Sequence, residues 1–281
     1  GDNAVGIKVS TGPLVNLAHY ASAEGKRALL VLDEFNRGNA AAILGDALVL
    51  IDKDKRGRAF VDLPYGDLGI NVPDEFAADG STSVSPHFTL PETLWIVAAM
   101  NTSDRSVAPL DAALRRRFSI YEMPPDYEVL AQHLGSDETA DLTEDLDAWT
   151  LGHVGQLSIE LLAALNTRID AVLGPDFRLG QSHLWHVRGD TVEQVLISLI
   201  AAFDYRVVPT LRLSLQDDDG ALAAILRAGT ASAPASGSIA ASWVPASPDL
   251  GTYGTDRLHV RPLSNEPLHS GFIELRRQAG L

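Results

Sequence analysis

Short apolar runs alternate with longer amphipathic stretches in the first part of the chain. The runs ALLVL (28–32) and TLWIVAA (93–99) are too short for buried helices, and we expect both to be buried parallel strands. A third strand is expected over FSIYEM (118–123), where Pro124-Pro125 would end it. Apolar residues at helical spacing predict helices over 13–24, 39–52 and 107–117. This order predicts an α/β fold, with a parallel sheet covered by helices on both faces.

The pattern changes after residue 126. Residues 127–228 have helical spacing, and helices are predicted over 127–134, 154–173, 191–206 and 217–228. Two segments have a biased composition: we expect a surface insertion at 66–91 and a linker rich in Ala, Ser, Pro and Gly at 229–249. We therefore divide the chain into an α/β core (1–126), a helical subdomain (127–228), and a linker with a C-terminal extension of unknown role (229–281).

Composition and charge narrow the class of protein. The 281 residues are 46% hydrophobic, which is enough for one large domain or two smaller ones. The chain has no Cys, which excludes disulfides and thiolate metal sites and fits a reducing cytoplasm. We see no signal peptide and no apolar run of the roughly 18–20 residues that a membrane span needs, so we expect a cytoplasmic protein without a membrane partner.

The net charge of −15 makes the chain a poor non-specific nucleic-acid binder by itself, because phosphate binding needs Lys and Arg. Any work on DNA would therefore need a partner or a local basic patch to make the contact.

Two polar clusters leave the predicted strands in the same direction. Asp33-Glu34 follows the first strand, and the segment from Asn101 to Arg105 follows the second. Functional groups of parallel sheets gather at the carboxyl ends of the strands. An Asp there can hold Mg²⁺ against nucleotide phosphates, and an adjacent Glu can polarise an attacking water. Asn101 could orient that water or sense the terminal phosphate.

Three consecutive cations, Arg115, Arg116 and Arg117, precede Phe118. Such cations can neutralise charge on a transferred phosphoryl group, as arginine fingers do.

Each motif alone also has a simpler interpretation. The acids could be exposed residues at a strand end, NTSDRS a turn that caps the next helix, and RRR a solvated face. A metal site at His183 and His186 lacks a suggested third ligand. A nuclease built on Asp33, Glu34 and Asp104 lacks a nearby Lys.

Taken in order, four motifs resemble the McrB family of AAA+ motors, the GTPase subunits of modification-dependent restriction systems. The motifs are VLDEFNRGN (31–39), IDKDKRG (51–57), MNTSDRSVAPLDAALRRRF (100–118) and LGPDFRLGQSH (173–183). The resemblance covers about residues 5–228 and is weaker in the helical part. It implies a partial AAA+ P-loop NTPase-like core over 1–126 and an α-helical lid over 127–228.

The resemblance also implies roles for single residues. Asp33 and Glu34 would form the Walker B pair, with Asp33 for Mg²⁺ and Glu34 for water activation. Asn101 resembles sensor 1, and Asp104 and Arg105 complete the family signature.

Further roles follow for three arginines. Arg116 and Arg117 resemble arginine fingers that act on the nucleotide of a neighbouring subunit. Arg178 lies in a segment that resembles the nucleotide-facing turn of the lid. The family often has Gly-His-Ser there, whereas this chain has Gly180-Gln181-Ser182, which leaves the role of the turn open.

The phosphate-binding motif of such motors, G-x-x-x-x-G-K-[ST], does not occur in this sequence. Gly25-Lys26-Arg27 lacks both the preceding loop and the hydroxyl. We therefore expect either a fragment that begins after the P-loop or a protein whose P-loop is carried by another chain. In both cases this chain alone should bind nucleotide poorly.

The leading hypothesis is an NTPase motor that uses Mg²⁺ with GTP or, second, ATP. Its expected partners are further copies in a ring, expected to be a hexamer, and an McrC-like endonuclease subunit. It would drive DNA translocation in restriction and phage defence, contacting DNA indirectly through the partner or missing domains. One alternative is a non-hydrolysing AAA+-like scaffold, which the missing P-loop favours and the intact acids disfavour. Another is a MoxR-like ATPase chaperone, against which MNTSDRS argues.

Overall fold

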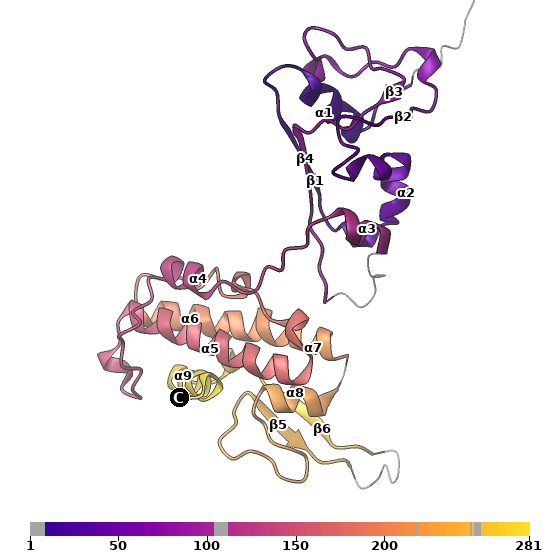
Figure 1. The fold of residues 1–281 in the computed structure, drawn as a ribbon. Coiled ribbons are helices and arrows are strands. Elements are labelled where there is room, and N and C mark those ends of the chain that lie inside the picture. Colours follow the sequence, from indigo (N-terminus) through magenta and orange to yellow (C-terminus); the bar gives the residue numbers. More distant parts are fainter. Residues whose placement is uncertain (1–8, 104–111, 217, 248, 250–253) are drawn as a thin grey trace, which may run out of the picture. The chain divides into compact units, whose positions relative to one another are not determined.

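The computed structural model describes residues 9–103, 112–216, 218–247, 249 and 254–281. The chain divides into two compact units, Gly1–Tyr121 (unit 1) and Glu122–Leu281 (unit 2) (Figure 1). The helices and strands of unit 1 are α1 (Pro13–Ser22), β1 (Ala28–Leu32), α2 (Ala40–Leu44), β2 (Val61–Asp62), β3 (His87–Phe88), β4 (Leu94–Ala98) and α3 (Ala112–Arg117).

A two-stranded parallel sheet lies at the centre of unit 1. β1 pairs with β4 in parallel, with Leu30 opposite Ile96, as the two apolar runs predicted. One face of the sheet is buried: Leu30 and Leu94 pack with Leu50 of the 3-10 helix Gly45–Ile51 in a core to which α1 contributes. Unit 1 therefore has a mixed α/β fold with a small, partial parallel sheet.

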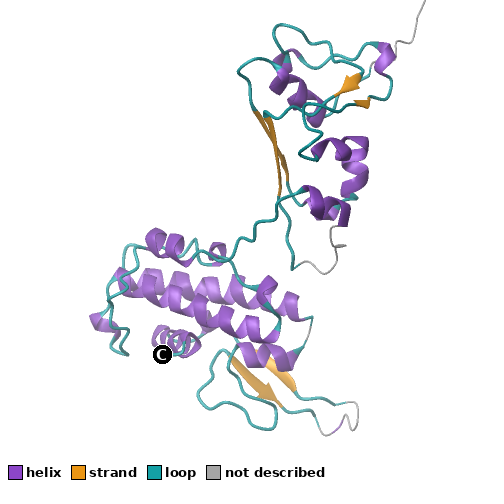
Figure 2. Ribbon diagram, viewed as in Figure 1, coloured by secondary structure: helices purple, strands orange, loops and turns teal. Residues whose placement is uncertain are grey.

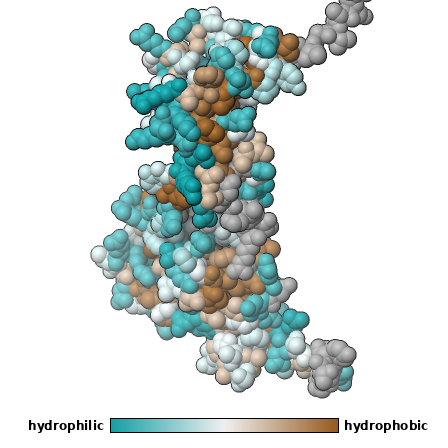
Figure 3. Space-filling view, turned by 45° about the vertical axis from the view of Figure 1, so that its right-hand side comes forward, coloured by the Kyte–Doolittle hydropathy of each residue, from teal (hydrophilic) through white to brown (hydrophobic). Residues whose placement is uncertain are grey.

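The other face of the sheet is at the surface of unit 1. Leu29 and Trp95 are opposite each other and are 55% and 68% exposed, and Val31 and Val97 follow at 58% and 49%. Apolar side chains reach the surface as brown areas in Figure 3. We expected helices on both faces of the sheet, but the described residues cover only one. The strand pattern alone does not specify what packs against the second face.

The third predicted strand is absent: the described residues 118–123 form no strand. Ile120, Tyr121 and Met123 are exposed instead, at 56%, 86% and 94%. An apolar alternating run becomes a strand only where a neighbouring strand satisfies its backbone groups, and no described strand pairs with it. The predicted helix over 39–52 is also interrupted, because α2 ends at Leu44 and a 3-10 helix begins at Gly45, whose φ is +51°.

Unit 2 is mainly helical, as Figure 2 shows. Its elements are α4 (Tyr127–Leu134), α5 (Leu151–Val172), α6 (Val192–Ala202), a π-helical turn (Phe203–Val207), α7 (Val208–Leu215), α8 (Asp219–Ile225), β5 (Ala241–Val244), β6 (Arg257–Val260) and α9 (Leu268–Ala279). The central helix is α5, which α4, α6, α8 and α9 all contact. Leu157, Leu161 and Leu165 of α5 are fully buried in the core that results.

The C-terminal part of the chain is built into unit 2. We expected a linker followed by an uninterpreted tail, but β5 pairs with β6 in an antiparallel hairpin and α9 packs on α5. The small side chains of Ala240 and Ala241, which suggested a linker, are 0% and 1% exposed because they fit a closely packed position. Residues 229–281 thus contribute to the core of unit 2.

Among the described residues, one helix is long and apolar enough to cross a membrane by length and composition, Val192–Leu215. It is the continuous helix from α6 to α7. Leu196, Leu199 and Phe203 of this helix are fully buried in the core of unit 2, which accounts for its composition.

Candidate functional site

The chain turns sharply where β1 ends. The backbone N–H of Ala99 donates to the carbonyl of Leu32, and the N–H of Phe35 donates to the carbonyl of Ala99, both at 2.9 Å. Between these bonds Glu34 adopts the left-handed conformation with φ of 50°, which is uncommon for a non-glycine residue. Asp33 Oδ1 accepts the Glu34 N–H at 3.0 Å and so supports the turn. Both acidic side chains are exposed at the carboxyl end of the strand.

Glu34 forms an ion pair with Arg37, at 3.1 Å between Oε2 and Nε. Both side chains are about three-fifths exposed, at 61% and 58%. An ion pair this exposed contributes only about 0.2–1 kcal/mol. The pair therefore orients the Glu34 carboxylate weakly and leaves it accessible.

The loop after β4 lies against the loop after β1. The side-chain Nδ2 of Asn36 donates to the backbone carbonyl of Asn101 at 3.1 Å. Asn101 Oδ1 accepts from the backbone N–H of Ser103 at 3.0 Å and from its hydroxyl at 2.7 Å. NTS thus forms an Asx turn, one of the interpretations of this motif. The Asn101 Nδ2 has no partner in the described parts of the chain and can donate a hydrogen bond.

These contacts bring Asp33, Glu34 and Asn101 together at one edge of the sheet, as their positions after two parallel strands predicted. No cluster of three or more His, Asp or Glu side chains that could hold a metal occurs among the described residues. A single exposed carboxylate such as Asp33 suits Mg²⁺, which keeps several waters and takes its other ligands from phosphates.

The three arginines at the end of α3 have different surroundings. Arg117 lies against Asp52: its Nε is 3.0 Å from Oδ1, and its Nη2 donates to Oδ2 at 3.4 Å. Its Nη1 donates to the carbonyl of Ala113 at 3.1 Å. Arg116 is exposed and has no partner among the described residues, whereas Arg115 has one. The structure therefore separates two residues that the sequence assigned to the same role.

Arg178 lies in unit 2, between the 3-10 helices Pro175–Phe177 and Gln181–His183. Its Nε donates to both carboxylate oxygens of Asp170, at 2.7 and 2.9 Å, and its Nη2 donates to Oδ2. These hydrogen bonds lower the pKa of Asp170 below its usual range and raise that of Arg178. Gln181, at the position where the family often has His, accepts the backbone N–H of Asp126 at 3.2 Å through its side chain.

Two predicted residues, Asp104 and Arg105, lie outside the described residues. His183 and His186 belong to no metal-binding cluster among the described residues. The pairing of Asp52 was not predicted, because its position in the motif IDKDKRG, three residues before Lys55, was the only signal in the sequence.

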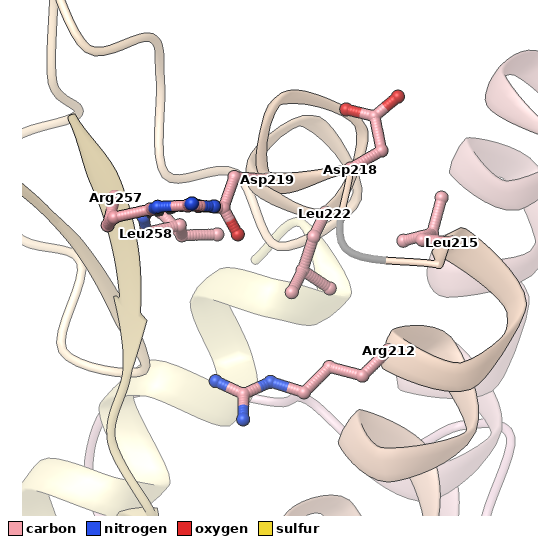
Figure 4. A pocket seen from close by; sticks show the side chains of 7 residues that line it. All are labelled: Arg212, Leu215, Asp218, Asp219, Leu222, Arg257 and Leu258. Carbon is pink, nitrogen blue, oxygen red and sulfur yellow. Dashed lines mark hydrogen bonds and ion pairs between the residues drawn. The ribbon is translucent and has the colours of Figure 1, made fainter. Parts of the chain in front are cut away.

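A cavity of about 230 Å³ lies in unit 2 (Figure 4). Its walls carry Arg212, Asp219 and Arg257, and Leu222 and Leu258 supply apolar surface. Asp219 already accepts the backbone N–H of Leu258 at 3.0 Å and pairs with Arg257 at 3.9 Å. The cavity is smaller than the roughly 300–1,000 Å³ of ordinary ligand pockets, and none of the predicted site residues lines it.

Comparison with known proteins gives the evolutionary context. Residues 3–118 match the family model for the AAA domain (dynein-related subfamily). The Type IV methyl-directed restriction enzyme EcoKMcrB subunit of Escherichia coli (strain K12) is 33% identical over 128 residues, which are 45% of this chain and 25% of that protein. The Type II restriction enzyme BsuMI component YdiS of Bacillus subtilis (strain 168) is 29% identical over 170 residues, 56% of this chain and 44% of that protein.

The matched regions thus amount to about a quarter and somewhat under half of the lengths of these relatives. The family match coincides with the part of the chain that contains both parallel strands and α3. Residues 3–118 therefore match an AAA domain, and the chain shows distant homology to the McrB and BsuMI restriction-system components.

Proposed function

We propose that this chain forms one wall of a nucleoside triphosphate hydrolysis site in an oligomeric AAA+ motor. The observation that carries the proposal is the pairing of the two strand-end loops, in which the Asn36–Asn101 hydrogen bond lies beside Asp33 and Glu34. Acidic residues after one strand and a free amide donor after its neighbour are the groups that phosphoryl transfer to water needs.

Each residue has a separate part in the proposed reaction. Asp33 would hold Mg²⁺, which would supply positive charge to neutralise the phosphate oxygens. Glu34 accepts a proton from water as the water oxygen bonds to the terminal phosphorus and the bond to the bridging oxygen breaks. Asn101 donates a hydrogen bond to the water or the phosphate. Arg116 and Arg117 serve the site of a neighbouring subunit, Arg116 by reaching its nucleotide.

The 281 residues contain no G-x-x-x-x-G-K-[ST] motif, the loop that binds nucleotide phosphates. The phosphate-binding loop of this site is therefore supplied from outside these residues. The chain by itself should therefore bind nucleotide weakly. Titration of the isolated chain with GTP, GDP and ATP should give dissociation constants far above micromolar. A sub-micromolar constant would show that a different cradle exists within these residues.

The biological setting is proposed from the relatives, whose names describe a subunit and a component of restriction enzymes. By that similarity, copies of the chain assemble in a cytoplasmic ring, expected to be a hexamer, with an McrC-like endonuclease. The motor uses GTP, or second ATP, and moves DNA through contacts made by the partner or other domains, in restriction and phage defence. The net charge of −15 supports this division of roles.

The direct test is nucleotide hydrolysis by the native assembly that contains this chain. Wild-type assembly should hydrolyse GTP or ATP only with Mg²⁺, and Asp33→Asn should lower kcat by about 100-fold or more, a typical loss for one positioned charged group. Asp67→Asn, which removes an exposed carboxylate in the 3-10 helix Gly66–Leu68, should leave kcat unchanged. Equal activity of the wild type and Asp33→Asn would refute the role of Asp33.

A second candidate is a non-hydrolysing AAA+-like scaffold, which the absence of a phosphate-binding motif from these residues favours. The same assay distinguishes the two. A scaffold would support assembly while nucleotide turnover stayed at the background rate in every variant.

A further inference from the structure

Residues 52–58 form a charged turn that is fixed to the sheet of unit 1. Arg56 donates through Nη2 to the carbonyl of Pro91, at 3.0 Å, and to that of Leu94. Burial lowers the pKa of Arg56, with a smaller opposing effect from Glu92. The N–H of Gly57 donates to the carbonyl of Leu90 at 2.9 Å. The turn thus has a defined position relative to the start of β4, the strand that leads to Asn101.

Asp52 begins this turn. Its backbone carbonyl accepts the N–H groups of Lys55 and Arg56, at 2.9 and 3.1 Å. Its carboxylate lies 3.4 Å from the Lys55 ammonium and within 3.0 Å of the Arg117 guanidinium. The backbone of Asp52 is therefore held by the turn, which is fixed to the sheet. Its carboxylate can bind a side chain from another part of unit 1.

The side chain that it holds is Arg117, 65 residues further along the chain. The two side chains are only 28% and 19% exposed, so solvent screens the attraction less than at an open surface. Nη2 donates to the carboxylate and Nη1 to the carbonyl of Ala113, whereas Nε lies 3.0 Å from the carboxylate without forming a hydrogen bond. Arg117 is thus occupied within its own subunit.

Helix α3 has six residues, and a helix this short is not stable without tertiary contacts. It is held by the Asp52–Arg117 pair and by Leu114, which is buried in the core of unit 1, and Phe118, the residue after the helix, has a ring contact with Phe35 at 5.8 Å between centroids. Successive residues of an α-helix differ by 100° in direction, so fixing Arg117 also fixes the direction of Arg116. Arg116 is exposed and unpaired among the described residues, and it is available to another molecule.

We propose that Asp52 is a positioning residue, which anchors Arg117 and thereby directs Arg116 toward the nucleotide of a neighbouring subunit. This inference rests on the proposed hydrolysis. The two arginines then have different roles. Arg117 holds the end of α3, and Arg116 makes the contact between subunits.

The test uses the native assembly and begins with single variants. Asp52→Asn keeps the size of the side chain and removes its charge, and it should lower kcat about 10-fold or more, as the loss of one positioned group does. Asp52→Glu should retain most of the activity. Asp54→Asn makes the same charge change two residues away at an exposed position, and it should match the wild type.

Mixed assemblies separate positioning from a general structural role. Subunits with Asp52→Asn keep their own Glu34, and subunits with Glu34→Gln keep their anchored arginines. Mixing the two should restore turnover at the sites of the Asp52→Asn subunits, as mixing should for Arg116→Ala. If Asp52→Asn instead impaired the hydrolysis site of the subunit that carries it, mixing would not restore turnover. The double variant Asp52→Asn/Arg117→Ala should be no slower than the slower single variant.

Hydrogen exchange of the 281-residue chain gives a reading without catalysis. The amides of α3 should exchange faster in Asp52→Asn than in Asp54→Asn. Wild-type assembly that fails to hydrolyse nucleotide would refute the proposed function. Active wild type with an unaffected or unrescued Asp52→Asn variant would overturn the positioning role alone.

Discussion

Unit 2 surrounds its central helix with other elements, whereas unit 1 covers only one face of its sheet. Leu161 and Leu165 of α5 are fully buried, whereas Trp95 of β4 is 68% exposed. Unit 2 also pairs the polar groups that it buries, such as Glu274. The candidate site lies in the less completely packed unit. A nucleotide site shared between several chain segments needs exposed surface on each segment, because the other segments pack there. The uncovered face of the sheet in unit 1 fits that need.

The largest expected effect comes from the core of unit 2. Phe272→Ala in α9 removes a fully buried ring that packs edge-on against Trp149, with centroids 4.8 Å apart. It should lower the free energy of unfolding by about 4 kcal/mol, because it leaves a cavity. Urea unfolding measures this change. A loss below about 1 kcal/mol would mean that the C-terminal helix is not part of the core and that the contrast with unit 1 is overstated.

A slightly smaller effect is expected from the buried charge of α9. Glu274 is 0% exposed and accepts hydrogen bonds from Arg277, Gln278 and the N–H of Ile239, at 2.6 to 3.1 Å. Glu274→Ala should cost about 3 kcal/mol, since it leaves the Arg277 guanidinium without its carboxylate. Urea unfolding of Glu266→Ala, which removes a partly exposed acid just before α9, provides the matched control and should show a much smaller change.

A pH-dependent effect is expected from Arg178 and Asp170. Because Arg178 lowers the pKa of Asp170 in the folded state, the stabilisation is present above the unfolded pKa of about 4. It is lost as the pH falls through the lower folded value. Unfolding midpoints should therefore differ between wild type and Arg178→Gln at pH 7 and converge below pH of about 3. A difference that is independent of pH would mean that Arg178 acts by packing instead.

The smallest effect is expected on the exposed face of the sheet. Trp95→Thr keeps a residue that favours strands and removes apolar surface that unit 1 does not bury, so the free energy of unfolding should change by less than about 0.5 kcal/mol. Leu94→Thr, one residue earlier and 0% exposed, should cost several times more. Equal losses in unfolding experiments would show that both faces of the sheet are covered.

The sequence predicted the parts of the molecule that depend on local pattern. The runs at 28–32 and 93–99 became β1 and β4 because their apolar residues suit a buried strand, and parallel pairing put Asp33 and Asn101 at one edge. The run at 118–123 had a similar pattern but formed no strand. A strand needs a neighbouring strand to pair with, and the apolar pattern does not show whether one is available.

Long-range polar pairing was beyond prediction from the sequence. Nothing near Asp52 indicates that it faces Arg117, 65 residues away, so the two adjacent arginines looked equivalent. Helix α9 was missed for a related reason: Glu274, Arg276 and Gln278 occupy buried positions, where they are stabilised by partners from α5, from the end of α8 and from nearby loops. Burial of paired polar groups hides the apolar periodicity that marks a helix face.

The central claim is that Glu34 activates water for nucleotide hydrolysis, and one measurement tests it most directly. In the native assembly, Glu34→Gln should lower kcat for GTP or ATP hydrolysis by about 100-fold or more and leave nucleotide affinity within about twofold, since it removes only the proton acceptor. Glu75→Gln, which changes an exposed acid elsewhere in unit 1, should match the wild type. Unchanged turnover in Glu34→Gln would contradict the account.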